Sequence, residues 1–325
     1  MKRISVIGGG AWGTALAAHL ARAGKAPQLW ARSEELVADV NDNQKNERYL
    51  SGITLPAGIQ ATTSLVDIKG TELALVVIPT QSLRTILEDA KPHLSNDATI
   101  LLCAKGIEKT TGKRTSDIAA EVMPNNPIAA LSGPSFAHDV ARGLPTAVTL
   151  AAPTLAMATT LSEAISSQGL RTYASDDVIG AELGGALKNV IALAVGMARA
   201  RRLGASAEAA LTTRGFTELS RIASHFGAKP ETLMGLSCLG DLMLTCSSPQ
   251  SRNFAYGMAV GNGEDLTQLK LAEGVHTTSI AAKLCKDAGI STPIIDAIDA
   301  VLSEALPIDE AMRKLMQRPL KAELG

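Results

Sequence analysis

Short apolar runs alternate with longer amphipathic segments through the first half of this 325-residue chain. Continuously apolar runs, such as 73–78 and 100–103, are typical of parallel strands that are buried on both faces. The pattern predicts strands at 3–7, 27–31, 73–78, 98–103, 127–132, 146–151 and 170–173. It predicts helices at 11–23, 33–41, 82–91, 114–122, 135–142 and 153–167, and an irregular connection at 42–64.

Strand signals stop after about residue 176, and helices broken by Gly or Pro follow. They are predicted at 178–201, 206–226, 230–236, 252–260, 277–288, 293–305 and 308–317. Asp176 and Asp177 precede the first of these, where acidic residues can cap a helix and complement its dipole. Strands alternating with helices, followed by helices alone, predict an α/β fold with a doubly wound sheet and an all-helical C-terminal domain. We place the two domains at 1–178 and 179–325.

A glycine-rich loop follows the first predicted strand and opens the first helix. Gly8, Gly10 and Gly13 have the GxGxxG spacing in the strand–loop–helix context that this motif requires. Gly8 permits the tight turn, Gly10 lets the backbone approach a pyrophosphate, and Gly13 allows close packing of helix and strand. Free N–H groups at a helix N-terminus bind phosphate. The loop predicts a Rossmann-type doubly wound sheet that binds a dinucleotide.

The end of the second predicted strand indicates which dinucleotide is preferred. NAD-preferring folds carry an acidic residue there, which bonds the ribose 2′-OH. This chain has Arg32, which can pair bidentately with a 2′-phosphate. We therefore expect NADP(H) to be preferred. Glu34 and Glu35 follow directly, so NAD(H) stays open as a second cofactor, and Arg32 could instead be a surface residue at the start of a helix.

Composition excludes several other classes of function. A net charge of −1 gives no long-range field for nucleic acid or an anionic membrane, and 3% aromatic residues are too few for a base-stacking platform. Four cysteines and five histidines show no metal-binding spacing, so no metal is expected. The longest apolar run, 190–198, is shorter than the ~20 residues that cross a bilayer. We expect a soluble cytoplasmic protein without an integral membrane segment, whose alanine-rich helices could form a homodimer.

Polar residues follow two of the predicted strands at their carboxyl ends, where open α/β sheets bind ligands. Lys105 follows the strand at 98–103 and would place a cation beside this crevice. Gly133 and Ser135 follow the strand at 127–132, together with Pro134, which suits a first helical turn. Ser135 could donate to a phosphate or cap the next helix. Lys105 could equally be a solvated lysine.

Lys188 interrupts a largely apolar helix in the second half. Gly184 and Gly185 lie four and three residues before it, on the same face. Two glycines cost roughly 2 kcal/mol of helix propensity relative to alanine, which indicates that another group comes close beside Lys188. A partly buried lysine is suited to proton transfer. The alternative is a lysine that extends to solvent, with glycines that serve helix packing alone.

A second polar cluster lies at 240–253. Ser251 is a natural N-cap, which places Arg252 and Asn253 in the first turn of a helix, where a phosphate can bind. Asp241 could orient a lysine ammonium or accept a substrate hydroxyl. The alternatives are a capped surface helix with a solvated arginine, and an aspartate in a simple turn.

Together these stretches closely resemble the bacterial NAD(P)-dependent sn-glycerol-3-phosphate dehydrogenases. The resemblance runs nearly end to end and is carried by the segments 8–16, 103–108, 131–137, 187–191, 213–215, 239–242 and 251–253. It implies reversible reduction of dihydroxyacetone phosphate to sn-glycerol 3-phosphate, a phosphate substrate that supplies the backbone of glycerophospholipids. The chain departs from the family at Cys238, where glycine is usual, and at Ala11, where serine or glycine is frequent.

The resemblance also implies roles for individual residues. Lys188 is implied as the catalytic proton donor and acceptor. The implied substrate-binding residues are Lys105, Gly133, Ser135, Asp241, Ser251, Arg252 and Asn253. Besides Gly8, Gly10 and Gly13, the implied cofactor-binding residues are Ala11, Trp12, Arg32, Lys105, Ala137, Arg252 and Glu273.

Two other functions stay open at this point. One is a different two-domain dehydrogenase, which would use the same Lys-Asn helix on a hydroxy acid and would need another anion site. The other is a module that binds NAD(P)H without catalysis and has no use for a lysine at position 188.

Overall fold

The computed structural model describes residue 1, residues 3–269 and residues 272–320. The chain divides into two compact units, the first formed by 1–185 with 226–241, and the second by 186–225 with 242–325. The predicted domains, 1–178 and 179–325, place both 179–185 and 226–241 in the helical half.

The first unit contains an eight-stranded sheet with the order β3-β2-β1-β4-β5-β6-β7-β8. Its strands are β1 (Ile4–Ile7), β2 (Gln28–Trp30), β3 (Gln60–Thr62), β4 (Leu73–Val76), β5 (Thr99–Leu102), β6 (Ile128–Ser132), β7 (Thr146–Ala151) and β8 (Leu170–Ser175). Seven of these lie where the apolar pattern predicts them. The edge strand β3 lies in the segment predicted to be irregular, because three residues at an edge leave little periodicity.

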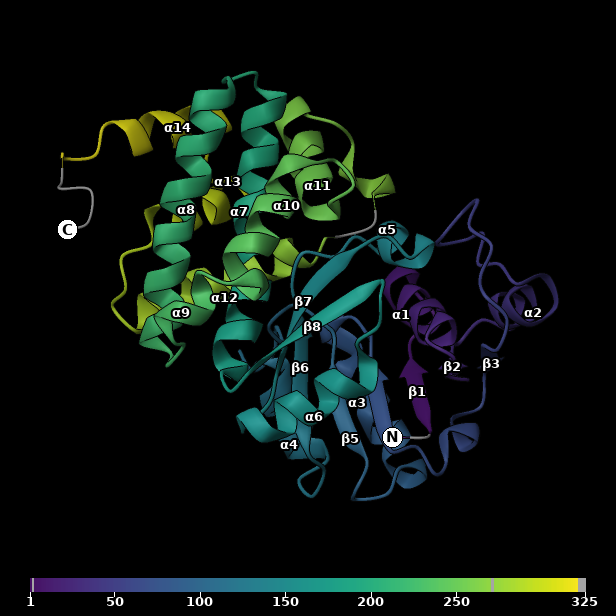
Figure 1. The fold of residues 1–325 in the computed structure, drawn as a ribbon. Coiled ribbons are helices and arrows are strands. Elements are labelled where there is room, and N and C mark those ends of the chain that lie inside the picture. The colour runs from purple at the N-terminus through teal and green to yellow at the C-terminus, as the bar shows by residue number, and fades with distance from the viewer. Residues whose placement is uncertain (2, 270–271, 321–325) are drawn as a thin grey trace. The chain divides into compact units, whose positions relative to one another are not determined.

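Helices cover both faces of this sheet, so the predicted doubly wound fold is confirmed. They are α1 (Ala11–Arg22), α2 (Glu34–Asn43), α3 (Thr80–Ala90), α4 (Thr115–Val122), α5 (Ala137–Arg142) and α6 (Leu155–Ile165). Neighbouring strand residues point to opposite faces. Val6 packs in one core with residues of α1, α2 and α6, whereas Ile7 packs in a second core with residues of α3 and α4. Figure 1 shows β1 in purple beside α1.

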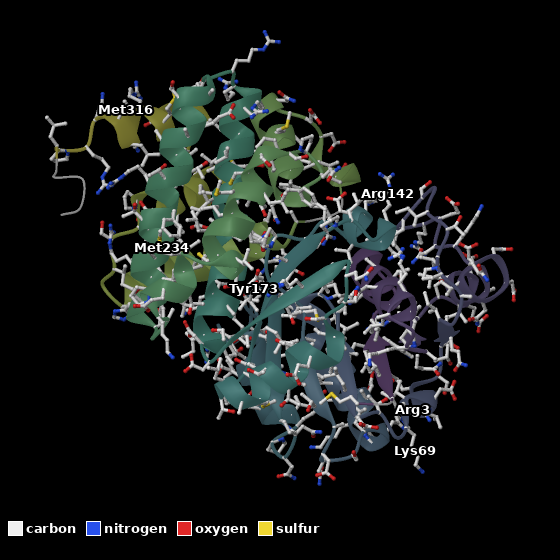
Figure 2. All side chains as sticks on the ribbon, in the orientation of Figure 1. Arg3, Lys69, Arg142, Tyr173, Met234 and Met316 are labelled. Carbon is white, nitrogen blue, oxygen red and sulfur yellow. The ribbon has the colours of Figure 1, made fainter. Side chains whose placement is uncertain are left out.

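One strand pair breaks the parallel pattern. β7 runs antiparallel to β6, and β8 is parallel to β7. The connection between β6 and β7 contains only the six-residue α5, which rises about 9 Å and is too short to return along a strand of about 17 Å. At the edge, alternate side chains of β8 are exposed; Figure 2 labels one of them, Tyr173, over which the Arg171 guanidinium lies 5.3 Å from the ring centroid.

The segment 226–241 adds α9 (Pro230–Leu233) and a π-helical turn, Leu236–Gly240, to the first unit. Asp177 links this segment to the start of α7 (Val178–Ala200). Its carboxylate accepts from Gly180 N at 2.8 Å and from Lys229 N at 2.8 Å. The predicted acidic cap at this helix is therefore confirmed for Asp177, while Asp176 pairs with the Lys229 ammonium at 2.7 Å.

The described residues of the second unit form helices and the loops that join them, with no strand. It contains α7 from residue 186 onward, α8 (Ala205–His225), α10 (Asp241–Ser247, from its second residue), α11 (Arg252–Asn262), α12 (Glu273–Asp287), α13 (Pro293–Leu302) and α14 (Ile308–Met316). The pattern predicts all of these except α10. α11 crosses α7 closely: a Cβ on Gly257 would lie 2.1 Å from Leu193 O.

By length and composition α7 could cross a membrane, but 89% of its most apolar 18-residue window is buried inside the structure. Such burial is typical of the core helix of a soluble protein.

A buried carboxylate ties α8 to α13. Glu218 accepts from Ile294 N at 2.9 Å and from Ile295 N at 3.3 Å, which caps the first turn of α13. Glu218 is 4% exposed. Burial raises the pKa of this carboxyl to about 7 against the opposing effect of the two backbone hydrogen bonds.

Candidate functional site

An ion pair joins two of the predicted site residues in the first unit. Lys105 Nζ lies 2.7 Å from Asp241 Oδ2, and it also donates to Gly133 O at 3.0 Å. The Asp241 side chain is 2% exposed and that of Lys105 is 20% exposed. An ion pair this well buried is strongly destabilised when one partner is removed, because the other charge is left uncompensated. Lys105 is therefore a fixed cation rather than a freely solvated lysine.

Other groups approach α7 closely at the two glycines before Lys188. A Cβ on Gly185 would lie 2.7 Å from Ser132 Oγ and 3.4 Å from Lys105 Cγ. A Cβ on Gly184 would lie 2.5 Å from the Cβ of Cys238. The expectation that another group lies close to this face of α7 is confirmed. Lys105 itself is one of these groups, because its aliphatic stem packs against Gly185.

The loop after β6 has a different local geometry from the one predicted. Ser135 Oγ donates to Gly133 O at 3.0 Å, and the N-cap of α5 is Phe136, so Ser135 does not cap the helix. Pro134 precedes α5 and does not occupy its first turn. Gly133 has φ +149°, and a Cβ there would lie 2.8 Å from Val148 Cα. Glycine is required at this position because β7 passes so close to it.

In the second unit, Lys188 is buried on α7 with 6% of its surface exposed. Its Nζ donates to Thr245 Oγ1 at 2.5 Å. Lys188 does not extend to solvent, so the alternative of a snorkelling lysine is wrong. Thr245, which holds the ammonium, was not among the predicted site residues. It lies four residues after Asp241 in α10, and it would have been found had 241–247 been predicted as a helix, since this spacing places both on one face.

The N-terminus of α11 has the predicted cap. Ser251 Oγ accepts from Phe254 N at 3.3 Å, and Arg252, the first helical residue, is exposed. Asn253 is buried, and its Oδ1 accepts from Gly274 N at 2.8 Å. This bond fixes the first turn of α12, in which Glu273 is the first residue. Asn253 therefore positions Glu273, a link that no sequence spacing indicates.

The glycine-rich loop has the strain and the open space that its motif predicts. Gly8 has φ +127°, and a Cβ on Gly13 would lie 1.8 Å from Gly8 O. A Cβ on Gly10, in contrast, would meet nothing within 4 Å. Gly10 is the N-cap of α1 and offers no side chain to cap the helix. The N-cap residue of α1 therefore gives its first N–H groups no side-chain acceptor.

A residue from the segment predicted to be irregular supports this loop. Asn46 is 1% exposed, and its Nδ2 donates to Gly9 O at 3.1 Å and to Thr14 Oγ1 at 2.8 Å. Thr14 Oγ1 in turn donates to Gly9 O at 3.3 Å. Asn46 therefore fixes the backbone of the loop from a distance of 37 residues along the chain. The sequence contains no signal for this contact.

The family model for the N-terminus of NAD-dependent glycerol-3-phosphate dehydrogenase matches residues 3–158, and the model for its C-terminus matches residues 177–313. The chain belongs to this family. The glycerol-3-phosphate dehydrogenase NAD(P)+ of Mesorhizobium japonicum is 55% identical over 322 residues, which cover 99% of this chain and 94% of that protein. That of Chelativorans sp. is 53% identical over 321 residues, 98% of each chain. A crystal structure of the Coxiella burnetii glycerol-3-phosphate dehydrogenase has a TM-score of 0.92 at 36% identity, and covers 98% of this chain and 99% of that one.

The dinucleotide that this dehydrogenase family uses fits the residues of the first unit. The open space at Gly10 and the uncapped start of α1 suit a pyrophosphate. Trp12 Nε1 is buried and has no hydrogen-bond partner among the described residues, so it can donate to a bound group. Arg32 is exposed two residues after β2, where a 2′-phosphate would lie. Ala137 begins α5.

The described residues contain no cluster of three or more His, Cys, Asp or Glu side chains that could hold a metal ion. All four cysteines lie among the described residues and are buried.

Proposed function

We propose that this chain reversibly reduces dihydroxyacetone phosphate to sn-glycerol 3-phosphate with NAD(P)H, and so supplies the backbone of glycerophospholipids in the cytoplasm. The observation that carries the proposal is Lys188, a buried lysine whose Nζ is held by Thr245 in a largely apolar helix. A buried, hydrogen-bonded lysine is an oriented proton donor. The family and this lysine together favour a carbonyl reduction over a dinucleotide sensor.

The substrate-binding residues of the proposal are Lys105, Gly133, Ser135, Asp241, Ser251, Arg252 and Asn253, and Lys188 is its catalytic residue. Arg252 and the N–H groups of the first turn of α11 would bind the phosphate of the substrate, because a helix N-terminus is an anion site. A hydroxy acid offers only a carboxylate for this position, and its turnover in place of dihydroxyacetone phosphate would favour the alternative dehydrogenase.

The cofactor residues of the proposal are Gly8, Gly10, Ala11, Trp12, Gly13, Arg32, Lys105, Ala137, Arg252 and Glu273. When bound, NAD(P)H supplies the hydride that reaches the carbonyl carbon. Lys188 Nζ gives its proton to the carbonyl oxygen as negative charge develops there, and takes a proton from solvent afterwards. Thr245 Oγ1 holds the ammonium in place during this transfer. That Asp241 also orients Lys188 is part of the proposal. NADPH is the preferred cofactor and a homodimer the proposed assembly.

The test is Lys188→Met, assayed by loss of the nicotinamide absorbance with dihydroxyacetone phosphate. Turnover should fall by roughly 10²–10⁴-fold, the usual contribution of general acid–base catalysis. The matched control is Lys229→Met, since Lys229 is an exposed lysine that pairs with Asp176; it should keep wild-type turnover. Near wild-type turnover in Lys188→Met would overturn the assignment, and cofactor binding without turnover in the wild type would favour the sensing module.

A further inference from the structure

Lys105 lies on a long connection that has no helix or strand of its own. β5 ends at Leu102, and α4 does not begin until Thr115. Part of the connection closes on itself: Glu108 N donates to Lys113 O at 2.9 Å, and Gly112 N donates to Glu108 O at 2.8 Å. These bonds shape the turn at 108–113 but do not fix where that turn lies relative to the sheet. Another element must do so if Lys105 is to meet Asp241.

A side chain of helix α3 (Thr80–Ala90) is hydrogen-bonded to the backbone of this connection. Gln81 Nε2 donates to Ile107 O at 2.8 Å, and Gln81 Oε1 accepts from Lys109 N at 2.9 Å. One side-chain amide thus pairs with the backbone on both sides of Glu108, as a neighbouring strand would. Such pairing fixes the position of the backbone as well as its direction. The residues that Gln81 holds begin at Ile107, two positions after Lys105.

A second residue of α3, one turn further on, holds the side chain between these two backbone groups. Arg84 Nε and Nη2 each donate to one carboxylate oxygen of Glu108 at 3.0 Å, and Thr111 Oγ1 donates to the same carboxylate at 2.5 Å. Glu108 is 6% exposed. The Arg84 guanidinium lowers the pKa of Glu108, against the effect of its burial. Arg84 also pairs with Glu121 of α4 at 2.9 Å, on the exposed side.

Stability alone does not explain this ion pair, in which the Glu108 carboxylate is buried and the Arg84 side chain is 30% exposed. Desolvation offsets most of the attraction, and apolar residues of similar volume would stabilise the fold as well or better. A bidentate pair does, however, specify geometry, because the planar guanidinium accepts a carboxylate in one orientation. The geometry specified in this case is that of the 107–109 backbone.

We propose that Gln81 and Arg84 form a clamp that positions Lys105 for substrate binding. The clamp holds residues 107–109 on α3, so that Lys105 Nζ reaches Asp241 Oδ2 and Gly133 O at hydrogen-bonding distance. Gln81 and Arg84 act through Lys105 and are positioning residues. The inference rests on the proposed function of Lys105 in binding dihydroxyacetone phosphate.

Two variants weaken the clamp without leaving a buried charge unpaired. Gln81 is exposed, and Gln81→Ala removes both of its hydrogen bonds to the backbone of the connection. Arg84→Lys keeps a cation beside Glu108 but loses the bidentate geometry. The matched control is Glu121→Gln, which removes the exposed ion pairs of Glu121 with Arg84 and Lys113 and none of the contacts of 107–109. For each variant the KM for dihydroxyacetone phosphate, kcat, the thermal midpoint, and calorimetric binding of glycerol 3-phosphate are measured.

Gln81→Ala and Arg84→Lys should each raise the KM and weaken glycerol 3-phosphate binding by about tenfold, within the ~10²-fold that a 1 Å misplacement can cost. Glu121→Gln should stay within about twofold of the wild type in both, since exposed ion pairs contribute little. A lowered thermal midpoint with unchanged KM and binding in both clamp variants would show a merely structural role and overturn the proposal. Absence of turnover in the wild type would instead contradict the proposed function.

Discussion

The contact between Gly184 and Cys238 gives a sharp prediction about the face of α7 that packs beside Lys105. A Cβ on Gly184 would lie 2.5 Å from Cys238 Cβ, 3.1 Å from Cys238 Cα and 3.2 Å from Cys238 Sγ. Carbon atoms in contact lie about 3.5–4.0 Å apart. Gly184→Ala therefore forces α7 and the turn Leu236–Gly240 about 1 Å apart. That turn leads directly into Asp241, the partner of Lys105.

Two effects of this substitution oppose each other. Alanine stabilises the helix by about 1 kcal/mol relative to glycine. Overpacking a close contact costs about 1–3 kcal/mol, and a gap this short belongs at the upper end of that range. The net expectation is that Gly184→Ala lowers the free energy of unfolding by about 1–2 kcal/mol. It should also raise the KM for dihydroxyacetone phosphate, because Asp241 moves with the turn.

A double-mutant cycle identifies the atom responsible. Cys238→Gly removes the Cβ and so the shortest contact, whereas Cys238→Ala removes Sγ and leaves the Cβ in place. In urea unfolding, Gly184→Ala should be about 1–2 kcal/mol less destabilising with Cys238→Gly than in the wild type, and equally destabilising with Cys238→Ala. The KM should recover only with Cys238→Gly. The reasoning is refuted if Gly184→Ala lowers the free energy of unfolding equally whether residue 238 is cysteine or glycine.

Two further predictions concern pH and the cofactor. Burial raises the pKa of Glu218 from 4.5 to about 7, so between these pH values the folded protein keeps a proton that the unfolded chain releases. The free energy of unfolding therefore falls by up to about 3 kcal/mol as pH rises through this window. Glu218→Gln should make the thermal midpoint less dependent on pH between about pH 5 and pH 8, and an unchanged dependence would contradict the raised pKa. Arg32→Asp should shift the ratio of kcat/KM values from NADPH toward NADH, because a carboxylate repels a 2′-phosphate and accepts from a 2′-OH; an unchanged ratio would remove Arg32 from the cofactor site.

Most secondary structure could be predicted because it depends on local patterns. Strands buried on both faces read as apolar runs, and the long helices begin at caps such as Ser251. The predictions failed where local pattern is weak. β3 is a three-residue edge strand, and α10 follows a π-helical turn with no polar cap that marks its start. The antiparallel direction of β7 follows from the short length of α5. Sequence patterns locate helix ends only to within a few residues, so they do not give this length closely enough to predict the direction of β7.

The sequence predicts candidate site residues, but it does not predict the contacts among them. Lys105 and Asp241 were both expected near the substrate, yet they lie 136 residues apart and nothing in their spacing pairs them. Thr245 was missed because its helix was missed. Asn46 and Arg84 were missed for a different reason: they hold backbone segments in place, and a positioning residue leaves no motif of its own.

The paired glycines of α7 show what a sequence can and cannot disclose. Their cost in helix propensity indicated that something approaches this face of the helix. The structure names the neighbours as Cys238 at Gly184, and Ser132 with the stem of Lys105 at Gly185. α7 then continues from the first unit into the second, and three residues after Gly185 it carries Lys188. One turn of helix thus packs on the lysine proposed to bind substrate and bears the lysine proposed to protonate it. The glycine-rich loop at the N-terminus accounts only for a dinucleotide, whereas both lysines proposed for the chemistry lie on α7 or against it.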